Sequence, residues 1–253
     1  FSFRAGKYYE KYGRENTRKA MARWYKNAIE NARCCPTAQE YHNTMPDPEK
    51  VAMVEPNPKV FLDNITVYDC SKVSDGASAL LVVSEEGLKK LNKSYAEAVE
   101  IIGIGQAIED ITQPPIDPTQ LDTTKVAVNK ALKMANISID QVATVECHDC
   151  FSIAGVMAIE AMGLAPYGKG ADFILEGNTA RNGRIPFNTT GGLIGWGHPV
   201  GATGVHQAVT IWEQLTGRAG DAQITIPADR PYGLTVNMGG DDKTLTSIVY
   251  KKL

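Results

Sequence analysis

Long apolar runs are absent from this sequence of 253 residues. No stretch approaches the roughly 18 consecutive apolar residues that a membrane-spanning helix needs, which excludes a transmembrane segment. Cysteine is also scarce, and its odd number, five, argues against a disulfide framework and favours a reducing compartment. With 43% hydrophobic and 22% charged residues, the chain has the composition of a globular protein with a sizeable core.

Basic residues are concentrated at one end. Residues 1–33 contain nine Lys and Arg side chains against three Glu, although the whole chain has a net charge of −3. Aromatic side chains interleave with them, at Phe1, Phe3, Tyr8, Tyr9, Tyr12, Trp24 and Tyr25. This mixture suits a segment that binds phosphates and stacks on bases, nucleic acids included, and it equally suits an amphipathic helix pair that binds no ligand.

The chain opens on Phe1, without an initiating Met, an apolar signal segment or an obvious transit pattern. We therefore expect these residues to be the interior of a longer polypeptide.

Segments of helical and extended character alternate along the chain. The spacing predicts a helix over residues 16–29, capped by Asn16 or Thr17, and the prolines between residues 45 and 58 predict a loop or linker. The apolar run at residues 79–83 predicts a strand buried on both faces, and residues 85–91 predict a helix after it. The alternation favours a layered α/β protein.

The second half of the chain continues this pattern. Residues 101–104 and 142–147 are expected to be strands, separated by a helix that Asp122 or Thr123 caps. Residues 234–238 and 245–250 predict a closing hairpin, so the sheet is expected to be mixed. Polar residues 148–151 directly follow a predicted strand, which is where ligands bind in open α/β sheets.

Cys147 and Cys150 have the CxxC spacing of metal and redox sites. Zinc needs four ligands, and strand geometry would direct Cys147 and His148 to opposite faces, so neither interpretation is well supported. Cys150 alone is a candidate reactive thiol, because the start of the next helix would lower its pKa. A buried structural cysteine is the competing interpretation.

Six glycines surround His198 in the segment from Gly191 to Gly204. Glycines let the backbone approach a ligand closely, and the following helix N-terminus adds positive potential. This imidazole is therefore a candidate for stabilising an oxyanion. The alternatives are a histidine satisfied by backbone groups in a glycine-rich turn, or a glycine loop that holds phosphate.

The other polar candidates receive no role. His42 lies in a polar loop and His206 lies within a predicted helix. Asp241 and Asp242 are interpreted as solvated turn residues, and no metal is assigned.

Three motifs occur in order along the chain: His-Asp-Cys-Phe at residues 148–151, Gly-His-Pro-x-Gly-Ala-Thr-Gly at residues 197–204 and Asn-Met-Gly-Gly at residues 237–240. Together they resemble the thiolase superfamily, in particular the branch related to sterol carrier protein 2 thiolase. Residues 74–79 and 160–164 add supporting likeness. The resemblance implies the thiolase fold, an α/β arrangement of αβαβα layers with mixed five-stranded sheets, whose N-terminal domain is incomplete in this chain.

The resemblance also implies a chemistry, the thiolytic cleavage of 3-oxoacyl-CoA by coenzyme A or the reverse Claisen condensation. It gives His198 and His148 the role of an oxyanion hole and Cys150 that of the acid and base. Backbone amides near Gly239 or Gly240 would form a second oxyanion hole. Coenzyme A is then a substrate, and no further cofactor or metal is expected.

The same resemblance implies an organisation of the chain. Residues 1–60 correspond to a loop domain that contacts CoA, residues 61–96 to the end of an N-terminal domain, and residues 97–253 to a C-terminal domain. No residue matches the family's nucleophilic cysteine, so we expect it on an upstream segment. A thiolase-like protein that binds acyl-CoA or lipid without catalysis is the alternative. The family implies a homodimer without a nucleic-acid partner, in a peroxisome, glycosome or mitochondrion.

Overall fold

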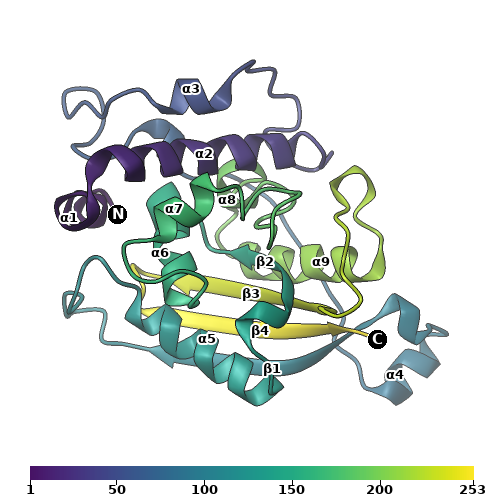
Figure 1. The fold of residues 1–253 in the computed structure, drawn as a ribbon. Helices are drawn as coiled ribbons and strands as arrows, with labels where there is room; N and C mark the ends of the chain where they lie inside the picture. Colours follow the sequence, from purple (N-terminus) through teal and green to yellow (C-terminus); the bar gives the residue numbers. More distant parts are fainter.

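The computed structural model describes all residues 1–253 and contains one mixed four-stranded sheet with helices packed against it (Figure 1). The strand order is β1-β4-β3-β2; β4 is antiparallel to both of its neighbours, and β2 and β3 are parallel. The strands are β1 (Val99–Ile108), β2 (Val142–Cys147), β3 (Tyr232–Gly239) and β4 (Thr244–Lys252). The strand predictions for residues 101–104 and 142–147 and for the closing hairpin are therefore confirmed.

Nine α-helices and four short 3₁₀ helices complete the fold. The α-helices are α1 (Ser2–Tyr12), α2 (Arg14–Ala32), α3 (Pro48–Ala52), α4 (Glu85–Lys90), α5 (Asp122–Ala135), α6 (Ser152–Ala161), α7 (Gly170–Leu175), α8 (Gly192–Gly195) and α9 (Thr203–Thr216). The 3₁₀ helices are Val67–Asp69, Tyr95–Glu97, Ile139–Gln141 and Gly220–Ala222. Helix α5 packs against β1 and β4, and α9 packs against β2, β3 and β4. None of the helices is long and apolar enough to cross a membrane.

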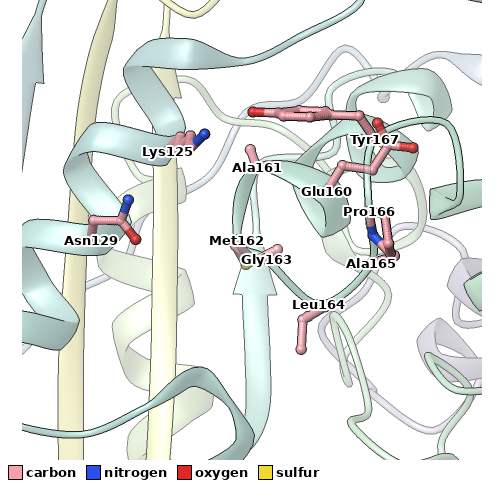
Figure 2. A pocket seen from close by; sticks show the side chains of 10 residues that line it. All are labelled: Lys125, Asn129, Glu160, Ala161, Met162, Gly163, Leu164, Ala165, Pro166 and Tyr167. Carbon is pink, nitrogen blue, oxygen red and sulfur yellow. The ribbon is translucent and has the colours of Figure 1, made fainter.

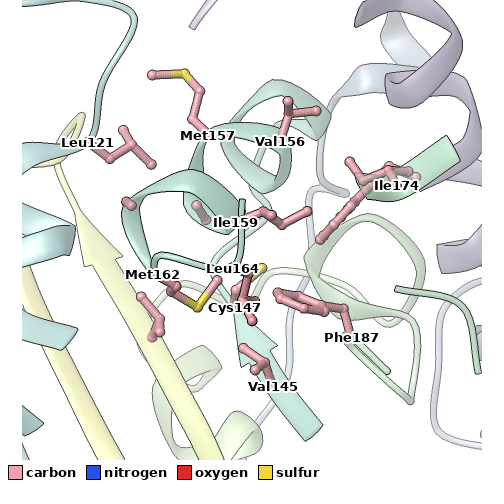
Figure 3. Close-up of a cluster of buried hydrophobic side chains, with 14 of the residues drawn as sticks. Leu121, Val145, Cys147, Val156, Met157, Ile159, Met162, Leu164, Ile174 and Phe187 are labelled. Carbon is pink, nitrogen blue, oxygen red and sulfur yellow. The ribbon is translucent and has the colours of Figure 1, made fainter. Parts of the chain in front are cut away.

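Helix α6 lies at the centre of the core, and all ten of its residues are buried. Its side chains meet Val145 and Cys147 of β2 and Phe187 from a nearby loop (Figure 3). Helices α2 and α7 pack against it as well. This burial matters for function because it fixes the turn at residues 148–151 that joins β2 to α6.

The first helical region differs from its prediction. Helix α2 begins at Arg14 rather than at a cap on Asn16 or Thr17, because Gly13, with φ of +100°, breaks the chain between α1 and α2. Thr17 lies inside the helix, where its hydroxyl donates to the carbonyl of Gly13. The predicted linker at residues 45–58 contains α3, capped by the carboxylate of Asp47.

The prediction of five-stranded sheets in αβαβα layers is wrong for residues 1–253, which contain one sheet of four strands. A fifth segment reaches the edge strand β2 but pairs with it through a single bridge between Val145 and Phe187. Pro186 has no N–H to extend this ladder, and Asn188 turns the chain away with φ of +49°. The predicted domain boundaries at residues 60 and 96 stay a prediction.

The predicted strand at residues 79–83 is not formed. The segment is extended, but its side chains are open to solvent, with Leu81 79% and Val82 73% exposed. An apolar run can be buried on both faces only when neighbouring strands and a covering layer are present, and no strand of residues 1–253 pairs with it. The helix expected after it is confirmed as α4.

Asp242 is not a solvated turn residue, because it is 4% exposed and caps α5. Its carboxylate accepts hydrogen bonds from the backbone N–H groups of Thr123 and Thr124, each at 3.0 Å, and from the Thr124 hydroxyl at 2.6 Å. The N-terminus of α5 is thus capped by a residue 118 positions away in sequence, which ties this helix to the turn between β3 and β4.

Replacing Asp242 by Ala should lower the free energy of unfolding by about 2 kcal/mol, since it removes the cap and leaves Ala in a left-handed conformation. Denaturant unfolding of the variant measures this loss. Asp229→Ala is the matched control, because Asp229 is exposed and makes no side-chain hydrogen bond, and it should stay within about 0.5 kcal/mol of the parent. Equal effects of the two substitutions would contradict the capping role.

Candidate active site

His148 directly follows the end of β2, and its ring lies edge-on to that of His198. The ring centroids are 5.0 Å apart at an interplanar angle of 87°. The imidazole is 8% exposed, and its Nδ1 is buried without a hydrogen-bond partner. Burial, and then the neighbouring His198, lower the pKa of His148 to about 3. His148 is therefore a neutral imidazole at physiological pH.

His198 is held at three points in the loop between α8 and α9. Its backbone N–H donates to the Ser74 hydroxyl at 2.8 Å, and its Nδ1 shares a 2.7 Å hydrogen bond with the Thr203 hydroxyl. The chain at His198 also forms a parallel bridge with Val73. The bond at Nδ1 leaves Nε2 available to a ligand, and burial lowers the pKa of the ring.

Cys150 lies two residues after His148 and is half-buried. Its backbone carbonyl accepts a hydrogen bond from the N–H of Ser71 at 2.8 Å. Burial, and then the charge of Asp149, raise the pKa of the thiol to about 12. The expectation that the helix N-terminus lowers this pKa is thus wrong, because desolvation outweighs the dipole. At neutral pH the group is a protonated thiol, which makes it a proton donor.

Asp149, between the two candidate residues, is the group that sequence reasoning missed. Its buried carboxylate accepts hydrogen bonds from the Trp24 indole N–H at 2.9 Å and from the backbone N–H of Leu193 at 2.7 Å. A side chain at Gly192 would meet this carboxylate at 2.7 Å. Burial raises the pKa of Asp149 to about 6. An acidic residue between two polar site residues at the end of a strand was the signal that could have found it.

Gly239 and Gly240 lie at the end of β3 and in the turn that follows. Their carbonyls accept hydrogen bonds from the N–H of Lys243, at 3.3 and 2.8 Å. Asp241, the next residue, is among the charges that raise the pKa of Cys150, so the turn lies near the thiol. The role of the two glycines as an oxyanion hole stays a prediction.

The two cysteines of the CxxC spacing are both free thiols. Cys147 is fully buried in the core (Figure 3), whereas Cys150 is half-buried. Among residues 1–253, no cluster of three or more His, Cys, Asp or Glu side chains is arranged to hold a metal ion.

The nine basic side chains of residues 1–33 all bind to other groups of the same chain. Eight of the nine form ion pairs, and the ninth, Arg33, donates to the carbonyls of Asn43 and Met45. The most buried pair joins Arg18 to Asp69 at 2.8 Å. These contacts favour the interpretation of a helix pair without a ligand over that of a phosphate-binding surface.

A cavity of about 370 Å³ lies between α5 and the loop after α6 (Figure 2). Glu160 and Tyr167 line it, and Lys125 reaches it from α5. Glu160 already accepts hydrogen bonds from the Tyr8 hydroxyl and from the N–H of Gly170. The cavity is at the C-terminal end of α6, whereas the candidate residues precede the N-terminal end, so it is not part of the candidate site.

A family model described as "Thiolase C-terminal domain-like" matches residues 105–252, more than half of the chain. The chain belongs to the thiolase family. Within this family it is similar to an acetyl-CoA acetyltransferase of Methanothermobacter thermautotrophicus, at 34% identity over 78% of the chain and 50% of the relative. Human sterol carrier protein 2 is 31% identical over 88% of the chain and 40% of the relative. The resemblance to the sterol carrier protein 2 branch of the thiolases is confirmed.

Solved structures share the fold at low sequence identity. An "Ltp2-ChsH2(DUF35) aldolase" has a TM-score of 0.81 at 17% identity, covering 99% of this chain and 62% of that one. A monomeric SCP2-thiolase-like protein of Mycobacterium smegmatis has a TM-score of 0.72 at 19% identity, covering 100% of this chain and 50% of that one. The thiolase-family chain thus spans about half or less of the length of the two curated relatives named above.

The low pKa of His148 predicts a pH-dependent contribution to stability. Between its ordinary value of 6.5 and about 3, the unfolded chain binds a proton at this residue and the folded chain does not. Acidification through this window therefore favours unfolding. Above the window His148 is neutral in both states and does not lower the free energy of unfolding. His148→Gln should remove it.

As the pH is lowered from roughly 6 to 4, the free energy of unfolding of the parent should fall relative to that of His148→Gln. The expected slope is up to about 1.4 kcal/mol per pH unit. Urea unfolding of both proteins across this range measures the difference. A difference that is independent of pH would mean that His148 keeps an ordinary pKa in the folded protein.

Proposed function

We propose that this chain carries the acid–base and oxyanion-binding groups of a thiolase that cleaves 3-oxoacyl-CoA with coenzyme A, or runs the reverse Claisen condensation. One observation supports this above the others: two imidazoles of lowered pKa lie against each other, and a protonated thiol, that of Cys150, follows two residues after the first of them. Neutral N–H donors stabilise a developing oxyanion without a charge of their own to be solvated, and a thiol supplies the proton that a carbanion needs.

In the proposed cleavage, a cysteine thiolate attacks the 3-oxo carbon, and the bond between C2 and C3 breaks. The electron pair passes into the thioester carbonyl, and the enolate oxygen accepts hydrogen bonds from His198 and His148. The Cys150 S–H gives its proton to C2 and releases acetyl-CoA. The Cys150 thiolate then takes the proton of the incoming CoA thiol, whose sulfur attacks the acyl group on the nucleophile.

The attacking cysteine is not among the groups at this site. Cys34 and Cys35 follow α2, and burial raises the pKa of the Cys70 thiol to about 11. The family resemblance implies a nucleophilic cysteine on an upstream segment, so the proposed turnover is that of the whole protein. Coenzyme A as substrate and a homodimeric assembly in a peroxisome, glycosome or mitochondrion belong to the same proposal.

The raised pKa of Cys150 favours one second candidate, a thiolase-like protein that binds acyl-CoA or lipid without turnover. A thiol with a pKa of about 12 is rarely a thiolate at neutral pH, and so is a poor base. Proton exchange at the α-carbon of acetyl-CoA separates the two functions, because it needs an acid–base group and an oxyanion hole but no nucleophile.

The chain should exchange the α-protons of acetyl-CoA with deuterium from D₂O, as followed by mass spectrometry. Cys150→Ala should slow this exchange about 100-fold or more, as the loss of an acid–base group does, and His198→Ala should slow it by about 100-fold. Cys34→Ala is the matched control, since this thiol lies outside the site, and it should exchange at the parental rate. Binding of acetyl-CoA without exchange would favour the non-catalytic function instead.

A further inference from the structure

Residues 71–76 run across both loops that carry the candidate groups. The N–H of Ser71 donates to the carbonyl of Cys150 at 2.8 Å, and that of Lys72 donates to the carbonyl of Leu193 at 3.3 Å. Val73 then forms its bridge with His198. One extended segment thus contacts the thiol-bearing loop first and the imidazole-bearing loop two residues later.

Ser74 makes the contact that bears most directly on His198. Its hydroxyl oxygen accepts the backbone N–H of His198 at 2.8 Å, and its own proton is donated to Oε1 of Gln39. Gln39 is fixed in turn, because its Nε2 donates to the carbonyl of Val73 at 3.2 Å and its backbone N–H donates to the carbonyl of Trp196 at 3.0 Å. A hydroxyl that donates and accepts in such a chain is polarised, and both of its bonds are strengthened.

Ser74 approaches the histidine loop so closely that position 197 has no room for a side chain. Gly197 has φ of +127°, and a Cβ at this position would lie 2.8 Å from the Ser74 hydroxyl and 2.5 Å from Oε1 of Gln39. A side chain would therefore push the segment away. On the other side of His198, a Cβ on Gly76 would come within 3.0 Å of the Pro199 ring. Residues 71–76 thus pack against the loop at both chain neighbours of His198, Gly197 and Pro199.

We propose that Ser74 is a positioning residue for His198. By holding the backbone N–H, it fixes the Cα from which the imidazole projects, and the Thr203 bond at Nδ1 then sets the rotation of the ring. Nε2 is left pointing in one direction before a ligand arrives, which is the preorganisation that an oxyanion donor needs. The catalytic meaning of this role rests on the proposed function, whereas the structural role does not.

Ser74→Ala removes the acceptor and tests the proposal by NMR on the folded chain. The His198 amide should exchange with D₂O at least tenfold faster than in the parent, and the titration curve of its imidazole should shift. The amide of His148 should keep its parental exchange rate, because its backbone N–H is held separately by the carbonyl of Val236. Ser78→Ala, in the same extended segment at a serine without a side-chain hydrogen bond, is the matched control and should leave all of these signals in place.

In the acetyl-CoA exchange assay, Ser74→Ala should lower kcat about tenfold, the effect of about one lost hydrogen bond, with KM changed less than twofold. Ser74→Thr keeps the hydroxyl and should restore both kcat and the His198 signals. Unchanged His198 amide exchange and titration in Ser74→Ala would overturn the inference whatever the turnover. Absence of His198-dependent exchange in the parent would instead contradict the proposed function.

Discussion

The carboxylate of Asp149 is the constraint on which the candidate site depends. It joins three parts of the chain that are distant in sequence, namely the turn after β2, the indole of Trp24 on α2 and the backbone at Leu193 that leads toward His198. The group is fully buried, and leaving its partners unpaired would cost the desolvation of each. The positions of His148 and Cys150 on either side of it are therefore set by a contact that touches neither ring nor thiol.

Burial governs the chemistry of the site as it governs its geometry. Removal from water disfavours charge, so it lowers the pKa of both imidazoles and raises that of the thiol in the same step. The result is a set of uncharged groups rather than an ion pair of imidazolium and thiolate. Such a set suits a reaction in which negative charge develops on the substrate, as on the enolate of the proposed thiolase reaction.

Local patterns predicted the strands and the site motifs, because alternation and glycine spacing are properties of short segments. They failed where residues far apart in sequence determine the local structure. The local pattern at Asp242 predicts a solvated turn residue, yet this residue caps a helix that begins 120 residues earlier. Residues 79–83 have a strand's composition without a strand to pair with, and the pKa of Cys150 follows burial that no local pattern reports. The hydrogen bond from His198 to Ser74 likewise joins residues 124 positions apart.

The central claim is that His148 and His198 together polarise the carbonyl of a bound acyl-CoA thioester. Infrared difference spectroscopy of acetyl-CoA labelled with ¹³C at the thioester carbonyl measures this polarisation directly. On binding, the carbonyl stretch should move to lower wavenumber, and His198→Ala should return it most of the way to its value in water. A bound carbonyl with an unshifted stretch, or a shift that persists in His198→Ala, would contradict it.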